Sequence, residues 1–178
     1  ALPHALQLRR GGTSVVLYLA ENTGIQVVYW GPDPGPMTPS DRAEFALASM
    51  PATYSSDSDI SPSLSLVPQQ SEGWTGTPGL VGSREGKRQF SRFETTSVST
   101  QDNGTDGSPS SVTITLYDDE ADVALTAVIE IAASGLLRTN AAITNCAETP
   151  YDVDSLLLAL PTPAKETRVI DQTGHHLR

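Results

Sequence analysis

Apolar and polar residues alternate along several stretches in the second half of the chain. The pattern is clearest in residues 112–117 and 123–131, and it continues in residues 137–144. Successive side chains of a β-strand point to opposite faces, so this alternation predicts strands with one buried face. In residues 152–160 the apolar positions change phase after Val153, which predicts a strand with a β-bulge. The positions expected on the shared faces are Val112, Ile114, Leu116, Val123, Leu125, Ala127, Ile129, Ile131, Leu137, Thr139, Ala141 and Ile143.

Earlier in the chain, residues 13–19 and 25–30 predict strands because they are rich in β-branched and aromatic residues. Residues 5–9 are a further candidate for a short strand. Prolines in residues 31–36 stop regular structure after them, since proline lacks an N–H donor.

Several weaker signals complete the pattern. Residues 90–99 predict a strand, and residues 63–67 and 166–171 are possible short strands. The polar residues 101–111 contain two turn dipeptides and predict a mobile hairpin loop. On the 90–99 strand one side is expected to carry Phe93, Thr95 and Ser97.

One short helix is predicted after the proline-rich segment. Thr38 can cap it, Pro39 suits its first position, and Asp41 falls near the positive end of the helix dipole. Pro51 ends it. Its apolar face is expected to carry Ala43, Ala46, Leu47 and Met50. Successive hairpins and a single helix predict an all-β fold, an antiparallel β-sandwich that occupies residues 1–178 as one domain.

Residues 73–87 stand out because they combine high glycine content with Trp74 and Arg84. Glycine weakens helices and strands, so the stretch predicts a shaped loop that presents these two side chains. A tryptophan ring can cover the apolar face of a sugar while a guanidinium bonds its hydroxyls. The alternative is that the basic residues of this region only offset nearby carboxylates at the surface. Those residues are Arg84, Lys87, Arg88 and Arg92.

Composition excludes several classes of function. A net charge of −10 argues against a nucleic-acid partner, and no run of about 20 apolar residues predicts a membrane span. The lone Cys146 cannot form an intrachain disulfide and is expected to be a packed, inert thiol at a strand end. With no recognisable signal peptide either, the expected location is the cytoplasm.

No cofactor and no metal site is expected. Adjacent histidines in extended chain point apart, so His175 and His176 with Asp171 do not predict a metal site. The acidic groups also lack calcium-binding spacing and are expected to be solvated turns. They are Asp57, Asp59, Asp118, Asp119, Glu120 and Asp122.

Short motifs spread over nearly the whole chain resemble, in order, the N-terminal region of bacterial α-galactosidases of glycoside hydrolase family 36. The resemblance looks closest to the actinobacterial branch of that family. The motifs are Leu8-Arg9, Gly12-Thr13-Ser14-Val15-Val16-Leu17, Val28-Tyr29-Trp30-Gly31, Gly73-Trp74-Thr75-Gly76-Thr77-Pro78-Gly79-Leu80 with Gly82, Arg84 and Gly86, Gly135-Leu136-Leu137-Arg138, Asn145, Pro150-Tyr151, Leu158-x-Leu160-Pro161 and Asp171-x-Thr173-Gly174-x-His176-Leu177-Arg178.

The resemblance implies a galactose mutarotase-like β-supersandwich followed by a catalytic (β/α)8 barrel. It implies retaining hydrolysis of terminal α-D-galactosyl residues from sugars such as melibiose and raffinose, with two barrel aspartates as the catalytic pair. No barrel motif occurs in these 178 residues, so the chain is expected to be a truncated fragment without catalytic residues and inactive alone.

By the same resemblance, the domain is expected to support a homo-oligomer and to dock on the missing barrel. Trp74 and Arg84 would then border the α-galactoside substrate, or the loop would only dock rigidly against the barrel. Unpaired strand edges of a truncated sandwich predict self-association. The alternatives are a stand-alone carbohydrate-binding or protein-interaction β-sandwich without catalysis, and a structural or adhesion module.

Overall fold

The computed structural model describes residues 5–19, 24–49, 64–88, 90–162 and 168. Within them, antiparallel strands dominate and one α-helix is present, which confirms the predicted fold class. The strands are β1 (Ala5–Arg10), β2 (Thr13–Tyr18), β3 (Gln26–Pro32), β4 (Leu80–Arg84), β5 (Lys87–Arg88), β6 (Glu94–Gln101), β7 (Ser111–Asp118), β8 (Val123–Ile131), β9 (Leu137–Asn145) and β10 (Tyr151–Leu156). The helices are α1 (Pro39–Ala48) and two 3₁₀ turns, η1 (Gln70–Glu72) and η2 (Thr105–Gly107).

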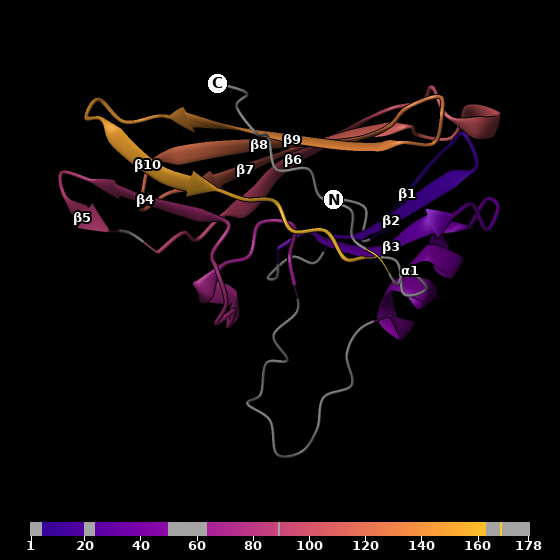
Figure 1. The fold of residues 1–178 in the computed structure, drawn as a ribbon, viewed down its shortest axis with the longest axis horizontal. Coiled ribbons are helices and arrows are strands. Elements are labelled where there is room, and N and C mark those ends of the chain that lie inside the picture. The colour runs from indigo at the N-terminus through magenta and orange to yellow at the C-terminus, as the bar shows by residue number, and fades with distance from the viewer. Residues whose placement is uncertain (1–4, 20–23, 50–63, 89, 163–167, 169–178) are drawn as a thin grey trace, which may run out of the picture.

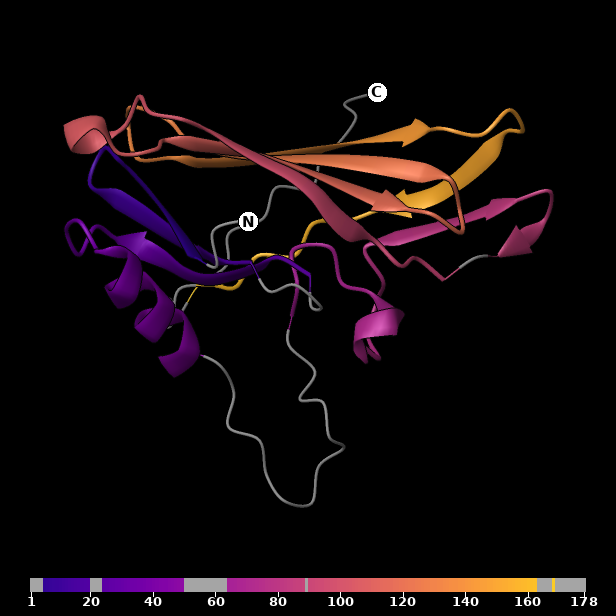
Figure 2. The same ribbon diagram turned by 180° about the vertical axis from the view of Figure 1, so that it is seen from behind.

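The strands form two layers (Figures 1 and 2). One layer is the sheet β6-β7-β8-β9, and the other contains the sheets β1-β2-β3 and β10-β4-β5 side by side. Between these two smaller sheets, backbone hydrogen bonds of Leu66 connect the residue before β3 to the segment that follows β10. Its N–H donates to the carbonyl of Ile25 at 2.6 Å, and its carbonyl accepts from the N–H of Ala159 at 2.8 Å. The second layer is therefore nearly continuous.

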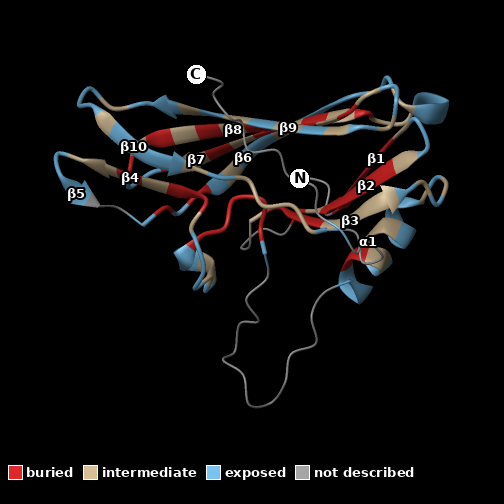
Figure 3. Ribbon diagram, viewed as in Figure 1, coloured by how far each residue is buried: buried red, intermediate tan, exposed pale blue. Residues whose placement is uncertain are grey.

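The core lies between the layers, where the predicted alternation is confirmed (Figure 3). Every second residue of β7 and β8 is buried, including Ile114, Leu125 and Ile129 at 0% exposure. Leu8 and Leu17 are equally buried in the facing layer. Apolar surface removed from water on both inner faces stabilises the sandwich.

Strand predictions from the weaker signals were less accurate. The strand expected at residues 90–99 is β6, which begins only at Glu94, and a register shift between Thr95 and Ser97 changes its phase. The prediction of a shared side was therefore wrong, because Phe93 is buried while Ser97 is exposed. The bulge expected in residues 152–160 is confirmed between Val153 and Ser155.

Local signals placed the helix correctly. Thr38 and Asp41 form a reciprocal capping box, with Pro39 in the first helical position. The predicted apolar face was partly wrong, because Ala46 is buried whereas Leu47 is 61% exposed.

The polar loop between β6 and β7 is tied to the first strand. The N–H of Arg9 donates to the carbonyl of Pro109 at 2.8 Å. The Arg9 side chain is 5% exposed and pairs with Asp33, with a Nη2–Oδ2 distance of 2.8 Å. Hydrogen bonding from Arg9 holds the pKa of the Asp33 carboxyl below its ordinary value. This buried ion pair joins β1 to the proline-rich segment that follows β3.

The single cysteine corrects another expectation. Cys146 is exposed, so the prediction of a packed thiol was wrong. It follows the last residue of β9, where its N–H still bonds the carbonyl of Asp122 but no layer covers its side chain. His175, His176, Asp171, Asp57 and Asp59 lie outside the described residues. In the described part, no three His, Cys, Asp or Glu side chains are grouped as metal ligands, and no helix has the length and apolar character to cross a membrane.

Candidate functional site

The glycine-rich stretch is a loop followed by a β-hairpin. Residues 80–84 form β4, so the prediction of a loop throughout was wrong there. Gly82 explains the difference. A Cβ at this position would lie 2.5 Å from a ring carbon of Tyr151 and 2.6 Å from the carbonyl oxygen of Asp152. Glycine here allows β4 and β10 to approach closely, which is a known role of glycine within strands.

The loop before β4 is folded around Trp74. Gly73 adopts a left-handed φ of 81° at the end of η1, which turns the chain into the loop. The indole Nε1 of Trp74 donates to the carbonyl of Thr77 at 3.0 Å. Gly76 lies against the indole, where a Cβ would come within 2.7 Å of a ring atom. The tryptophan is half-buried and held by its own loop, so its orientation is defined without a ligand.

Arg84 stands at the other end of β4 and directs its guanidinium toward neighbouring turns. Its Nη2 donates to the carbonyl of Ala121 at 2.7 Å and to Oδ1 of Asn145 at 2.9 Å. Its Nη1 bonds the carbonyl oxygen of Thr149 and, at 3.1 Å, the Oγ1 of the same residue. The guanidinium also lies over the ring of Tyr151, 5.4 Å from its centroid. These contacts connect β4 to the β7–β8 turn, the last residue of β9 and the β9–β10 turn, which lie at the same end of β8 and β9.

The two predicted site residues are thus not adjacent. Trp74 precedes β4 and Arg84 ends it, so roughly 13 Å of strand separates the two ends. A single ligand that touched both side chains would have to span β4. Of the other basic residues, Arg92 is exposed, and its Nη2 lies 3.8 Å from Oε1 of Glu94. This pairing agrees with the alternative prediction, in which basic residues of the region only offset nearby carboxylates at the surface.

Prediction from sequence missed a buried glutamine beneath the loop. Gln69 is 1% exposed, and its Oε1 accepts from the N–H of Phe93 at 2.5 Å while its Nε2 donates to Glu72 at 2.9 Å. Glu72 in turn accepts from the N–H of Gly24. The carbonyl of Gln69 accepts from the N–H of Trp74 at 3.3 Å. Gln69 therefore ties the Trp74 loop to both layers, and no sequence motif marks it.

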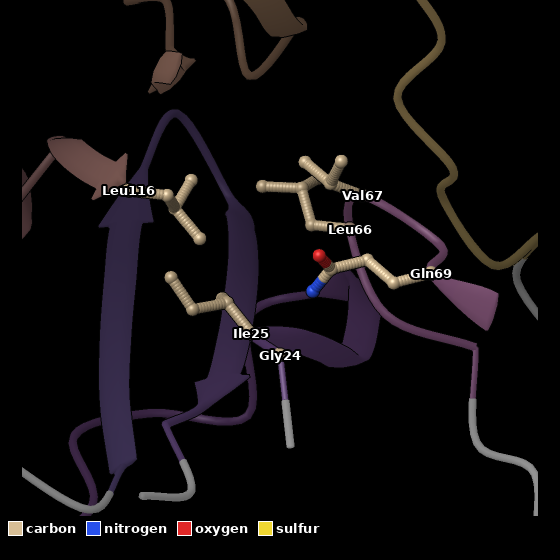
Figure 4. Close-up of a pocket in the computed structure, with 6 residues that line it drawn as sticks. All are labelled: Gly24, Ile25, Leu66, Val67, Gln69 and Leu116. Atoms are coloured by element: carbon tan, nitrogen blue, oxygen red, sulfur yellow. The ribbon is translucent and has the colours of Figure 1, made fainter. Parts of the chain in front are cut away.

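Two hollows lie near this region. The first, beside Gln69 and Ile25, measures about 10 Å³, which is at the lower limit for one water molecule (Figure 4). It is a packing void of the core. The second measures about 230 Å³ and lies along β4, between the Trp74 loop and the segment that leads to β6. Its lining residues are Gln70, Pro78, Leu80, Val81, Gly82, Phe90 and Ser91.

The contacts of Arg84 predict a structural effect. Replacing Arg84 with alanine is expected to lower the free energy of unfolding by about 2 kcal/mol, because carbonyl acceptors from distant turns lose a charged donor. Urea unfolding followed by circular dichroism measures this change. Lys87→Ala, which removes an exposed cation from the first residue of β5, is the matched control and should change stability by less than about 0.5 kcal/mol. Equal stability of both variants would contradict the structural role.

Comparison with known proteins agrees with this fold. Residues 23–178 match the family model of the glycosyl hydrolase family 36 N-terminal domain. The chain therefore belongs to glycoside hydrolase family 36, as the sequence motifs indicated. A comparison with curated proteins gave no match.

Solved structures of α-galactosidases show the same architecture. The AgaA A355E D548N variant from Geobacillus stearothermophilus, solved with raffinose, aligns with a TM-score of 0.63 and 16% identity over 86% of this chain and 24% of that one. The A355E variant, solved with 1-deoxygalactonojirimycin, aligns with a TM-score of 0.60 and 12% identity over 86% of this chain and 24% of that one. AgaB from the same organism aligns with a TM-score of 0.55 and 16% identity over 88% of this chain and 23% of that one. The chain thus spans about a quarter of these enzymes.

Proposed function

We propose that this chain is the N-terminal β-sandwich domain of a longer, cytoplasmic α-galactosidase. In this proposal the longer protein hydrolyses terminal α-D-galactosyl residues with retention, using two carboxylates of a (β/α)8 barrel outside these 178 residues. The observation that carries the proposal is the match of residues 23–178 to the family 36 N-terminal domain. The sandwich would dock on the barrel and support assembly with further copies of the enzyme.

Within that enzyme we propose that Trp74 contacts the substrate rim. Its indole is half-buried and fixed by the bond to Thr77, so a ring face is presented at low entropic cost. The role proposed for Arg84 at the rim is indirect, because its guanidinium donors hold the turns beside β4. It would set the position of the hairpin, and the Trp74 loop would make the contact.

The proposal is tested by assaying the longer protein that contains this chain. It should release p-nitrophenol from p-nitrophenyl α-D-galactopyranoside and galactose from raffinose, whereas the 178-residue chain alone should not. Trp74→Ala in the longer protein is expected to raise KM for raffinose about fivefold with a smaller change in kcat, since it would remove a binding contact of about 1 kcal/mol. Light scattering on the same sample gives the number of copies.

Activity only on another class of glycoside would contradict the substrate, and no activity on any glycoside would favour a binding module without catalysis. An unchanged KM after Trp74→Ala would contradict the rim contact while leaving the enzymatic function intact.

A further inference from the structure

One edge of the four-stranded sheet is β9, which pairs with β8 alone. The pairing runs along the whole of β9 without a register shift. The backbone N–H and C=O groups that β9 turns away from β8 have no strand beside them in the part of the chain that the structure describes. A long, straight edge of this kind is a template on which another strand can pair.

The face of β9 that points toward the core is only half-buried. Its apolar residues Leu137, Ala141 and Ile143 pack against the core but remain partly exposed, whereas the β8 residues opposite them are all 0% exposed. Figure 3 shows the change from the red bands of β8 to the tan and pale blue of β9. The facing layer thus covers β8 and leaves β9 partly open to solvent. Side chains of a further strand beside β9 would remove this apolar surface from water.

The other edge strands of the described structure carry features that discourage pairing. Register shifts interrupt the pairing of β3, β6 and β10, Pro32 ends β3, and β5 has only two residues. In β1, the N–H of Arg9 already bonds the carbonyl of Pro109. Acidic residues on β6 and β10 would repel the same strand of a second copy. By contrast, β9 has no proline, no register shift and no acidic residue, so it is the edge best suited to association.

We infer that two copies of this chain associate edge to edge through β9, with the two strands antiparallel and Asn140 on the two-fold axis. In this register Leu137 of each copy lies opposite Ile143 of the other. Thr139 lies opposite Ala141 in the same way. The half-buried rows of both copies therefore meet on one face of a continuous sheet, and the contact is self-complementary, as two-fold symmetry requires.

Charge agrees with a second copy as the occupant of this edge. Arg138, the one charged residue of β9, lies opposite Glu130 of its own β8 and would face the neutral Ala142 of the second copy. Two chains of net charge −10 repel one another overall, and this edge places no carboxylate of β9 against the other chain. The inference rests on the proposed function only in serving the assembly proposed there, and it needs no catalytic barrel.

Light scattering on the 178-residue chain tests the association. The measured mass is expected to rise reversibly from one copy toward two with concentration, because a contact confined to residues 137–143 is small and therefore weak. Asn140→Lys places two ammonium groups together at the axis, so the dissociation constant should rise about fivefold or more, and added salt should restore part of the loss. Ser97→Lys, which places the same charge on the exposed edge of β6, is the matched control and should associate like the wild type.

Disulfide formation tests the register. In a Cys146→Ser background, Asn140→Cys should bring two thiols opposite each other with Cα atoms about 5 Å apart, which is within the range of a disulfide. Ala142→Cys is the matched control, because it is exposed on the same face but would lie about 14 Å along the strand from its copy. Mild oxidation should cross-link Asn140→Cys at least about tenfold faster than Ala142→Cys, since pairing raises the effective concentration of its thiols.

A strict monomer at every concentration would overturn the inference. So would equal association of Asn140→Lys and the wild type, or equal cross-linking of Asn140→Cys and Ala142→Cys. Hydrogen exchange adds a further test, because the amides of β9 that point away from β8 should gain protection only as the chain associates. Protection of these amides in the monomer would mean that another segment of the same chain occupies the edge, and would also overturn it.

Folding and catalysis are kept apart from this test. The substituted residues on β9 and β6 are exposed, so each variant should unfold at the wild-type urea concentration when it is monomeric. None of these outcomes bears on hydrolysis by the longer protein. Failure of the β9 contact and failure of the proposed function are therefore distinguishable.

Discussion

Replacing Arg9 with methionine is expected to lower the free energy of unfolding by about 3–5 kcal/mol. The guanidinium is 5% exposed and makes three bonds of 2.8–3.1 Å to the Asp33 carboxylate. Methionine fills a similar space but leaves that carboxylate, itself 15% exposed, without its partner. Urea unfolding at neutral pH measures the loss. Arg138→Met, which alters an exposed arginine of β9, is the matched control.

The double variant Arg9→Met with Asp33→Leu should recover part of the loss, because removing both charges abolishes the unpaired buried ion. The dependence of the free energy of unfolding on pH, measured below neutral pH, provides a second test. The pKa of Asp33 is lowered by Arg9, so its contribution is present above about pH 4 and is lost as the pH falls through the lower folded value. The stability difference between wild type and Arg9→Met should therefore shrink below pH 4. A difference that did not shrink at all as the pH fell below 4 would contradict the ion pair as its source.

Replacing Gln69 with leucine is expected to lower the free energy of unfolding by about 2–4 kcal/mol. Leucine is close in size but cannot accept from the N–H of Phe93 or donate to its carbonyl, so both groups are left buried without this partner. The change also frees Glu72 from the amide that holds it. The Trp74 loop should loosen as a result, which the fluorescence of the two tryptophans reports.

Gln70→Leu is the matched control, since the neighbouring side chain is exposed and bears no such bonds in the described structure. It should unfold within about 0.5 kcal/mol of the wild type. If Gln69→Leu behaved like this control, the buried amide would not be what holds the loop to the core.

Much of the candidate site depends on contacts between residues far apart in the sequence. Trp74 and Arg84 were predicted as site residues from their residue types, and their short separation in sequence suggested that they act together. The structure places β4 between them, because Gly82 lets this segment pair with β10. The acceptors of Arg84 come from Ala121, Asn145 and Thr149, which no local pattern could indicate.

What the sequence by itself determined is the set of features encoded by neighbouring residues. Alternation predicted β7 and β8, and the capping residues predicted the start of α1, because strand faces and helix caps depend on residues a few positions apart. Ordered motifs indicated the family, which the match over residues 23–178 confirmed.

Only the tertiary structure decided that a glycine-rich stretch contains a strand, that Gln69 is buried, and that Ser91 lines a hollow without a hydrogen-bond partner. Each of these depends on which distant segment packs against the residue. Burial and hydrogen-bond satisfaction are properties of the assembled layers, so they cannot be read from local sequence.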